Sequence, residues 1–196
     1  STLRRKGHTG PIELVTAEEH LPYDRPPLSK DVLTGARDQT TLPFDVEKLS
    51  VTVHLGRAAT GLDTAAKVLH TTGGDLPYDG LVIATGADPI VLPGDGPQRT
   101  LRTVDDALAV RQALVPGAKI VLIGASWIGA EVATAALAAG CEVTCLEAGD
   151  TPLAHALGDE VAGRLRHWWS GVDLRCGTAV RQIRADYTAM AQSHKG

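Results

Sequence analysis

Residues 119–147 read KIVLIGASWIGAEVATAALAAGCEVTCLE, two apolar runs separated by a glycine turn and a segment rich in alanine. The first run, 119–123, is typical of a strand buried in a parallel sheet. The turn occupies 124–129, and the small residues of 130–139 predict a helix. The second run, 142–146, predicts another strand. The order strand, turn, helix, strand is that of a parallel α/β unit.

The same pattern continues toward the C-terminus. Residues 159–169 predict a helix and 172–176 a third strand, which together extend the unit to a right-handed βαβαβ arrangement. The tail, 185–196, has no usable period and receives no assignment.

The turn has the spacing of a dinucleotide fingerprint. Gly124 suits the tight turn, and Gly129 allows the helix to pack closely on its strand. Ser126 replaces the middle glycine, but its hydroxyl can donate to a phosphate. The backbone amides that begin the helix, at Trp127, Ile128 and Gly129, would face a pyrophosphate with the helix dipole behind them.

An acidic residue follows at the expected distance. Glu147 lies 23 residues after Gly124, where a carboxylate takes the ribose hydroxyls of an adenosine. Glu147 and Asp150 together would repel a 2′-phosphate, so the sequence favours NAD over NADP.

Ser126 also allows an alternative, a nucleophile elbow with Asp150 and His155 downstream in hydrolase order. The elbow requires glycine two residues after the serine, whereas this chain has Ile128 there. A β-branched side chain crowds so sharp a turn, which disfavours acyl transfer.

The first half of the chain is less regular. A proline-rich loop, 21–28, precedes Ser29, which we expect to cap a short helix at 30–34. Short strands are expected at 12–16, 49–55, 58–62 and 66–71, and a buried strand at 81–86. Residues 88–97, rich in Pro and Gly, indicate a linker. We place the boundary between two lobes at 98/99.

Composition excludes several classes of function. The chain has 196 residues with 43% hydrophobic and 21% charged residues and a net charge of −4, which argues against nucleic-acid binding. Its apolar runs are too short to span a membrane. Three cysteines make no disulfide framework, and seven histidines show no metal-binding spacing. We expect reduced thiols, no metal site and a cytoplasmic location.

Three runs carry a resemblance to a known family: LPYDRPPLSK at 21–30, YDGLVIATG at 78–86 and GASWIGAE at 124–131. They resemble the FAD-dependent pyridine nucleotide oxidoreductases, most closely the NADH:ferredoxin (rubredoxin, putidaredoxin) reductase branch. The resemblance implies an α/β fold with two Rossmann-like, doubly wound lobes, both incomplete. A partial FAD-binding domain would occupy 1–98 and an NAD-binding domain 99–196. It also implies hydride transfer from NADH to FAD, with electrons passed on to a [2Fe-2S] ferredoxin or a similar acceptor.

The resemblance also implies roles for individual residues. Lys30 would lie near the flavin and pair with Glu131 beside the nicotinamide, and both are candidate catalytic residues. The cation would stabilise the reduced flavin, and the carboxylate would accept from the nicotinamide carboxamide. The remaining candidates for cofactor binding are Glu18, Arg25, Ala59, Thr85 and Gly86. The segment 21–30 has no cysteine, so dithiol chemistry is not expected.

Part of the family pattern is missing. Its first strand and glycine-rich FAD turn would precede Ser1, and we expect a truncated or partly ordered form of a longer reductase. Ser1–Lys6 then reads as the last turn of a helix, followed by Gly7. The alternative function is a non-catalytic dinucleotide-binding or interaction fragment.

Overall fold

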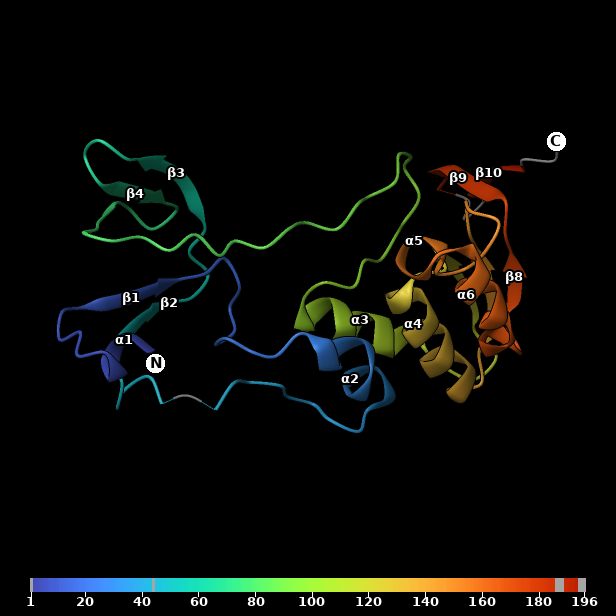
Figure 1. The fold of residues 1–196 in the computed structure, drawn as a ribbon, viewed down its shortest axis with the longest axis horizontal. Coiled ribbons are helices and arrows are strands. Elements are labelled where there is room, and N and C mark those ends of the chain that lie inside the picture. Colours follow the sequence, from blue (N-terminus) through green and yellow to red (C-terminus); the bar gives the residue numbers. More distant parts are fainter. Residues whose placement is uncertain (1, 44, 186–188, 194–196) are drawn as a thin grey trace. The chain divides into compact units, whose positions relative to one another are not determined.

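The computed structural model describes residues 2–43, 45–185 and 189–193, and it divides into two compact units (Figure 1). The first unit contains 1–24 and 40–87, and the second contains 25–39 and 88–196. The segment 25–39 therefore packs with the second half of the chain and not with its neighbours in sequence.

The first unit is built from two small sheets. In one, β1 (Ile12–Val15) pairs in parallel with β2 (Val51–His54). The other is an antiparallel sheet of β3 (Ala59–Asp63), β4 (Val68–Thr71) and β5 (Leu76–Pro77). The expected strands at 12–16, 49–55, 58–62 and 66–71 are confirmed within one to two residues at most ends. One helical turn, α1 (Thr2–Arg5), precedes β1, and Gly7 follows it at φ +85°.

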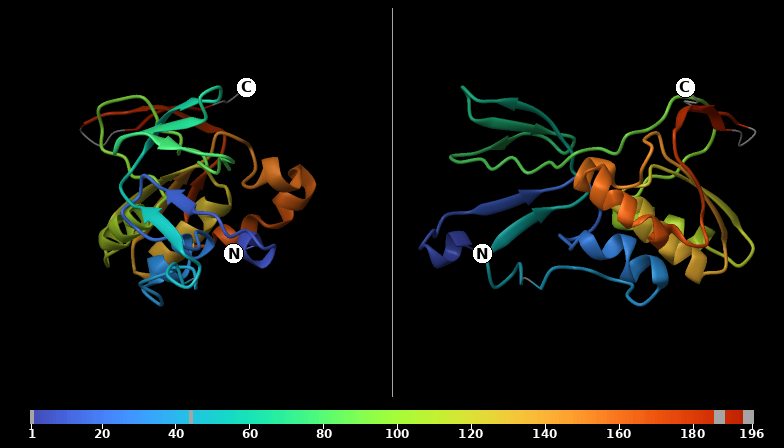
Figure 2. Two further views of the ribbon diagram at one scale, coloured as in Figure 1. Left: turned by 90° about the vertical axis from the view of Figure 1, so that its left-hand side faces the viewer. Right: turned by 45° about the vertical axis from the view of Figure 1, so that its right-hand side comes forward.

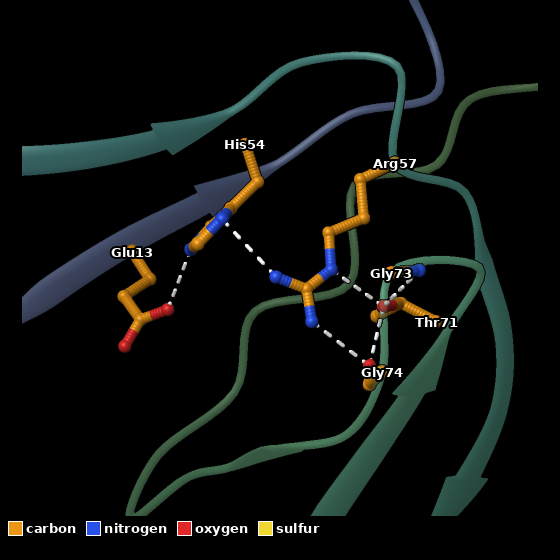
Figure 3. Close-up of polar contacts among 6 residues, drawn as sticks. All are labelled: Glu13, His54, Arg57, Thr71, Gly73 and Gly74. Atoms are coloured by element: carbon orange, nitrogen blue, oxygen red, sulfur yellow. Dashed lines mark hydrogen bonds and ion pairs between the residues drawn. The ribbon is translucent and has the colours of Figure 1, made fainter.

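Arg57 connects the two sheets of the first unit (Figure 3). Its guanidinium Nε donates to the Thr71 hydroxyl at 2.6 Å and Nη2 to the Gly74 carbonyl at 2.9 Å. Nη1 lies 3.2 Å from Nδ1 of His54, whose Nε2 lies 2.8 Å from a carboxylate oxygen of Glu13. One planar cation thus joins β2 to the hairpin turn that follows β4.

The prediction of a buried strand at 81–86 is wrong. Residues 81–90 have no regular secondary structure, and Val82 and Ile83 are 87% and 69% exposed. A strand requires neighbouring backbone groups to pair with, and within the described residues this segment has none.

The second unit contains the expected parallel sheet. β6 (Lys119–Ile123), β7 (Glu142–Leu146) and β8 (Asp173–Arg175) lie in that order, with Ile120 opposite Val143 and Cys145 opposite Leu174. The helix between the first two strands is α4 (Trp127–Ala138). The helix expected at 159–169 is divided into α6 (Asp159–Arg164) and the 3₁₀ turn η2 (Arg166–Trp169), and it follows α5 (Ala154–Leu157). These helices are gold to orange in Figure 2.

Small side chains hold the sheet and α4 together. One cluster of buried side chains in this unit consists of Ala125, Ala133, Ala136, Cys141, Val143, Cys145 and Trp169. β6 is only half-buried, because Val121 and Ile123 are 56% and 43% exposed. The expectation that the strand at 119–123 is buried is therefore wrong, since its residues 119, 121 and 123 are exposed and only 120 and 122 are partly buried.

The proline-rich segment forms two short turns that pack on the second unit. These are the 3₁₀ turn η1 (Pro26–Ser29) and α2 (Asp31–Thr34), which ends at Gly35 with φ +76°. α2 contacts α3 (Val104–Ala113) and α4. α3 begins with a capping box in which Thr103 and Asp106 exchange hydrogen bonds. Leu28, Val32 and Leu33 are buried, which explains why the segment stays with this unit.

Two further strands close the described part of the second unit. β9 (Thr178–Ile183) pairs with β10 (Ala189–Ser193) in antiparallel orientation. The expected linker also packs here, because Ile183 donates to the Pro93 carbonyl and accepts from the Gly96 amide. The tail thus includes a strand that its sequence did not indicate, whereas 186–188 and 194–196 lie outside the described residues. None of the helices described reaches the length and apolar content that a membrane crossing requires.

Candidate dinucleotide site

The turn between β6 and α4 is as tight as its two outer glycines suggest. Gly124 has φ +97°, a conformation that L side chains rarely adopt, and its amide donates to the Leu146 carbonyl at 2.8 Å. A Cβ on Gly129 would lie 2.2 Å from the Gly124 carbonyl oxygen. Glycine at position 129 therefore lets the first turn of α4 pack directly against the end of the strand.

The start of α4 is open to a ligand. Ser126 is the N-cap residue, yet its side chain makes no capping hydrogen bond and is exposed. Trp127 and Ile128 are 47% and 50% exposed. The first amides of a helix lack intrahelical acceptors, so this end presents N–H donors and a partial positive charge. The geometry fits an anionic phosphate group.

Glu147 is bound to this turn by its carboxylate. Oε2 accepts from the amide of Ala125 at 2.6 Å, and Oε1 accepts from the amide of Gly149 at 2.8 Å. A carboxylate offers about four acceptor positions, so each oxygen retains one for a hydroxyl. The glycine turn and the acidic residue of the expected dinucleotide fingerprint thus lie together at the carboxyl ends of β6 and β7.

Two thiols lie close to the same carboxylate. Burial, and after it the charge of Glu147, raises the pKa of the Cys145 thiol to about 12. Burial likewise raises the pKa of Cys176. A raised pKa keeps a thiol in its protonated, less reactive form.

Lys30 and Glu131 form the ion pair that the family resemblance implies. Lys30 Nζ lies 2.9 Å from Oε1 of Glu131, and the two side chains are 52% and 28% exposed. Lys30 Nζ also donates to the Pro26 carbonyl at 3.2 Å. The pair connects the segment before α2 to the first turns of α4, and a partner molecule can reach it from solvent.

Ser29 is a site residue that the sequence did not reveal. Its hydroxyl donates to Oε2 of Glu131. It was expected to cap the helix at 30–34, but the helix begins at Asp31 with Lys30 as its N-cap, so that expectation is wrong. The only available signal was the position of Ser29 next to Lys30 in a run that resembles a known motif.

Two surface pockets flank Glu131. One of about 420 Å³ is lined on α4 by Trp127, Glu131, Thr134 and Leu137, with Trp168 and Trp169 opposite. The other, of about 250 Å³, is lined by Ser29, Lys30, Asp31, Thr34, Glu131 and Thr134. Glu131 therefore lines both pockets, and the surface of each is mostly apolar.

The other candidates for cofactor binding make contacts of their own or lie in the first unit. Arg25, in the second unit, donates to the Arg102 carbonyl at 2.5 Å. In the first unit, Glu18 accepts a hydrogen bond from the Tyr23 hydroxyl, and Ala59 begins β3 with its side chain exposed. Thr85 and Gly86 lie in the exposed segment that follows β5. Their roles in cofactor binding stay predictions. Among the described residues there is no group of three or more His, Cys, Asp or Glu that could hold a metal ion.

Known proteins are similar to this chain in sequence and in fold. The family model for pyridine nucleotide-disulphide oxidoreductases matches residues 1–195. The ferredoxin–NAD(+) reductase component of the p-cumate 2,3-dioxygenase system of Pseudomonas putida is 38% identical over 94% of this chain and 48% of its own. The crystal structure of Fdr9 has a TM-score of 0.92 and 52% identity, covering 96% of this chain and 49% of its own. A covalent putidaredoxin reductase–putidaredoxin complex has a TM-score of 0.85 and 29% identity, covering 97% and 50%. The chain thus spans about half the length of these relatives, and its α/β fold class is confirmed.

Proposed function

Because the chain belongs to the pyridine nucleotide-disulphide oxidoreductase family, we propose that it is the NADH-binding part of a flavin-dependent reductase for an iron–sulfur protein. The bond between Glu147 and the glycine turn is the observation that supports this most directly. It places a carboxylate for ribose hydroxyls beside amides for a pyrophosphate. The relatives named as ferredoxin–NAD(+) reductase components support the choice of acceptor, a small ferredoxin.

The residues present fit NADH. Gly124 and Ser126 would leave room for the pyrophosphate, since even a Cβ on Gly124 would meet no atom within 4 Å, and Gly129 would keep the start of α4 close to it. Trp127 and Ile128 would lie against the ligand, and Glu147 would accept from the adenosine ribose. We propose NADH and not NADPH as the substrate, because a 2′-phosphate would approach a carboxylate.

FAD, when bound, supplies the electron transfer chemistry, taking hydride from NADH and releasing electrons singly. Lys30 is exposed enough to reach a ligand and would hold a positive charge where negative charge develops. Glu131 would accept an N–H of the nicotinamide carboxamide and so orient the ring. Arg25, Glu18 and the backbone at Ala59, Thr85 and Gly86 are the further residues that we propose for FAD. With three free cysteines, we propose the reducing cytoplasm as its location.

The test uses the purified chain supplied with FAD under anaerobic conditions. NADH should give heat of binding in calorimetry and then bleach the visible flavin absorbance. Lys30→Met should slow bleaching by about tenfold or more, since it removes one preorganised charge. The matched control is Lys48→Met, an exposed lysine of the first unit, which should leave the rate unchanged. Absence of any heat with NADH would contradict the proposal.

The alternative is a non-catalytic dinucleotide-binding fragment, favoured by the exposed run Leu81–Ile83 and by the half-length match to the relatives. Both functions predict binding of NADH. Nucleotide binding in a chain that retains no flavin would support the fragment, whereas bleaching supports the reductase.

A further inference from the structure

The carboxylate of Glu131 is held at both of its oxygens by consecutive residues of another segment. Lys30 Nζ contacts Oε1 at 2.9 Å, and the Ser29 hydroxyl donates to Oε2. Ser29 and Glu131 are 102 residues apart in sequence. Two contacts on two oxygens fix the plane of the carboxylate, whereas a single contact leaves it free to rotate.

The two side chains that contact Glu131 differ in conformational freedom. The Lys30 side chain is long and 52% exposed, so it retains rotational freedom and its ion pair is screened by solvent. Ser29 is a buried residue, 8% exposed, with one rotatable bond before its hydroxyl. Because Leu28 and Val32 on either side are buried as well, the backbone that carries this hydroxyl is firmly packed.

The Ser29 hydroxyl does not cap the helix that follows it. The turn η1 ends at Ser29, and α2 begins after it without a side-chain cap. A serine at such a boundary usually bonds to nearby backbone amides. Here its proton is directed across to α4.

We propose that Ser29 is a positioning residue that orients the Glu131 carboxylate toward the nicotinamide carboxamide, so that the chain distinguishes NADH from nucleotides without the nicotinamide. This rests on the proposed function, in which Glu131 accepts from the carboxamide. Lys30 provides the positive charge of the ion pair, and Ser29 fixes the orientation of the Glu131 carboxylate.

The test compares two ligands by calorimetry on the 196-residue chain. Ser29→Ala should weaken NADH binding by about three- to tenfold, less than the loss of a direct hydrogen bond to a charged group, because Ser29 acts on the ligand only through Glu131. ADP-ribose, which lacks the nicotinamide, should bind Ser29→Ala as it binds the wild type. A misfolded variant would lose both ligands, so retained ADP-ribose binding shows that the fold is intact.

Two further variants sharpen the result. Ser170→Ala makes the same chemical change at an exposed serine that follows η2 in the same unit, and it should change neither affinity. In a Glu131→Ala background, Ser29→Ala should have no further effect on NADH, because the hydroxyl acts through the carboxylate.

Two results would overturn the inference, and they can be told apart. If the wild type binds both ligands and Ser29→Ala binds NADH equally well, Ser29 does not position Glu131, and the proposed function stands. If the wild type binds neither ligand, the proposed function and the inference fail together.

Discussion

Glu147 Oε2 accepts the amide proton of Ala125 at 2.6 Å, which fastens the end of β7 to the turn between β6 and α4. The carboxylate thereby holds the turn in place, and its remaining lone pairs can accept hydrogen bonds from a ligand. A substitution at this residue therefore changes both the geometry of the turn and the binding of the ligand.

We expect Glu147→Gln to weaken NADH binding by about ten- to a hundredfold, since hydrogen bonds to a charged acceptor contribute about 1.5–3 kcal/mol. NADPH should be affected less, because the repulsion of its 2′-phosphate is removed as well. Calorimetry with both nucleotides measures the ratio. Glu142→Gln, at the exposed start of the same strand, is the matched control. An unchanged preference between the nucleotides would rule out Glu147 as the selective residue.

Gly129→Ala should destabilise the chain by about 1–3 kcal/mol, the usual cost of overpacking. The new methyl group would lie 2.2 Å from the Gly124 carbonyl oxygen, a backbone atom that cannot easily move away. Urea unfolding followed by circular dichroism measures the loss. Gly163→Ala in α6 meets no atom within 4 Å and should be neutral or slightly stabilising. Equal effects of the two substitutions would show that the close approach is absent.

Val82→Ala and Val143→Ala make the same chemical change in two different surroundings. Val82 is 87% exposed and Val143 is 5% exposed. We therefore expect a loss below about 0.5 kcal/mol for the first and about 2 kcal/mol for the second. Denaturant melts of both variants provide the comparison. A large loss at Val82 would mean that the segment is packed in solution.

Cys145 should resist alkylation by iodoacetamide at pH 8 in the folded chain, because the thiolate is the reactive form and its pKa is about 12. Half-buried Cys176 should react first, as mass spectrometry of the labelled peptides will show. An acid whose pKa is raised by folding stays protonated in the native state. Stability from this thiol is therefore present below the reference pKa of 9.0 and is lost as the pH rises toward 12. Rapid labelling of Cys145 without denaturant would contradict the expectation.

The sequence by itself determined the parallel unit of β6, α4 and β7 and the places of Gly124 and Gly129. These follow from hydrophobic periodicity and from backbone sterics, which are local properties of the chain. The Lys30–Glu131 pair was also anticipated, but through resemblance to a family and not from spacing.

Only the tertiary structure decided the rest. An apolar run becomes a buried strand only when another strand pairs with it, and 81–86 has no such neighbour among the described residues. The contact from Ser29 to Glu131 joins positions 102 residues apart, and local pattern cannot foresee which distant acceptor a hydroxyl will meet. Hydrogen bonding across the fold depends on packing, whereas helix and strand periodicity does not.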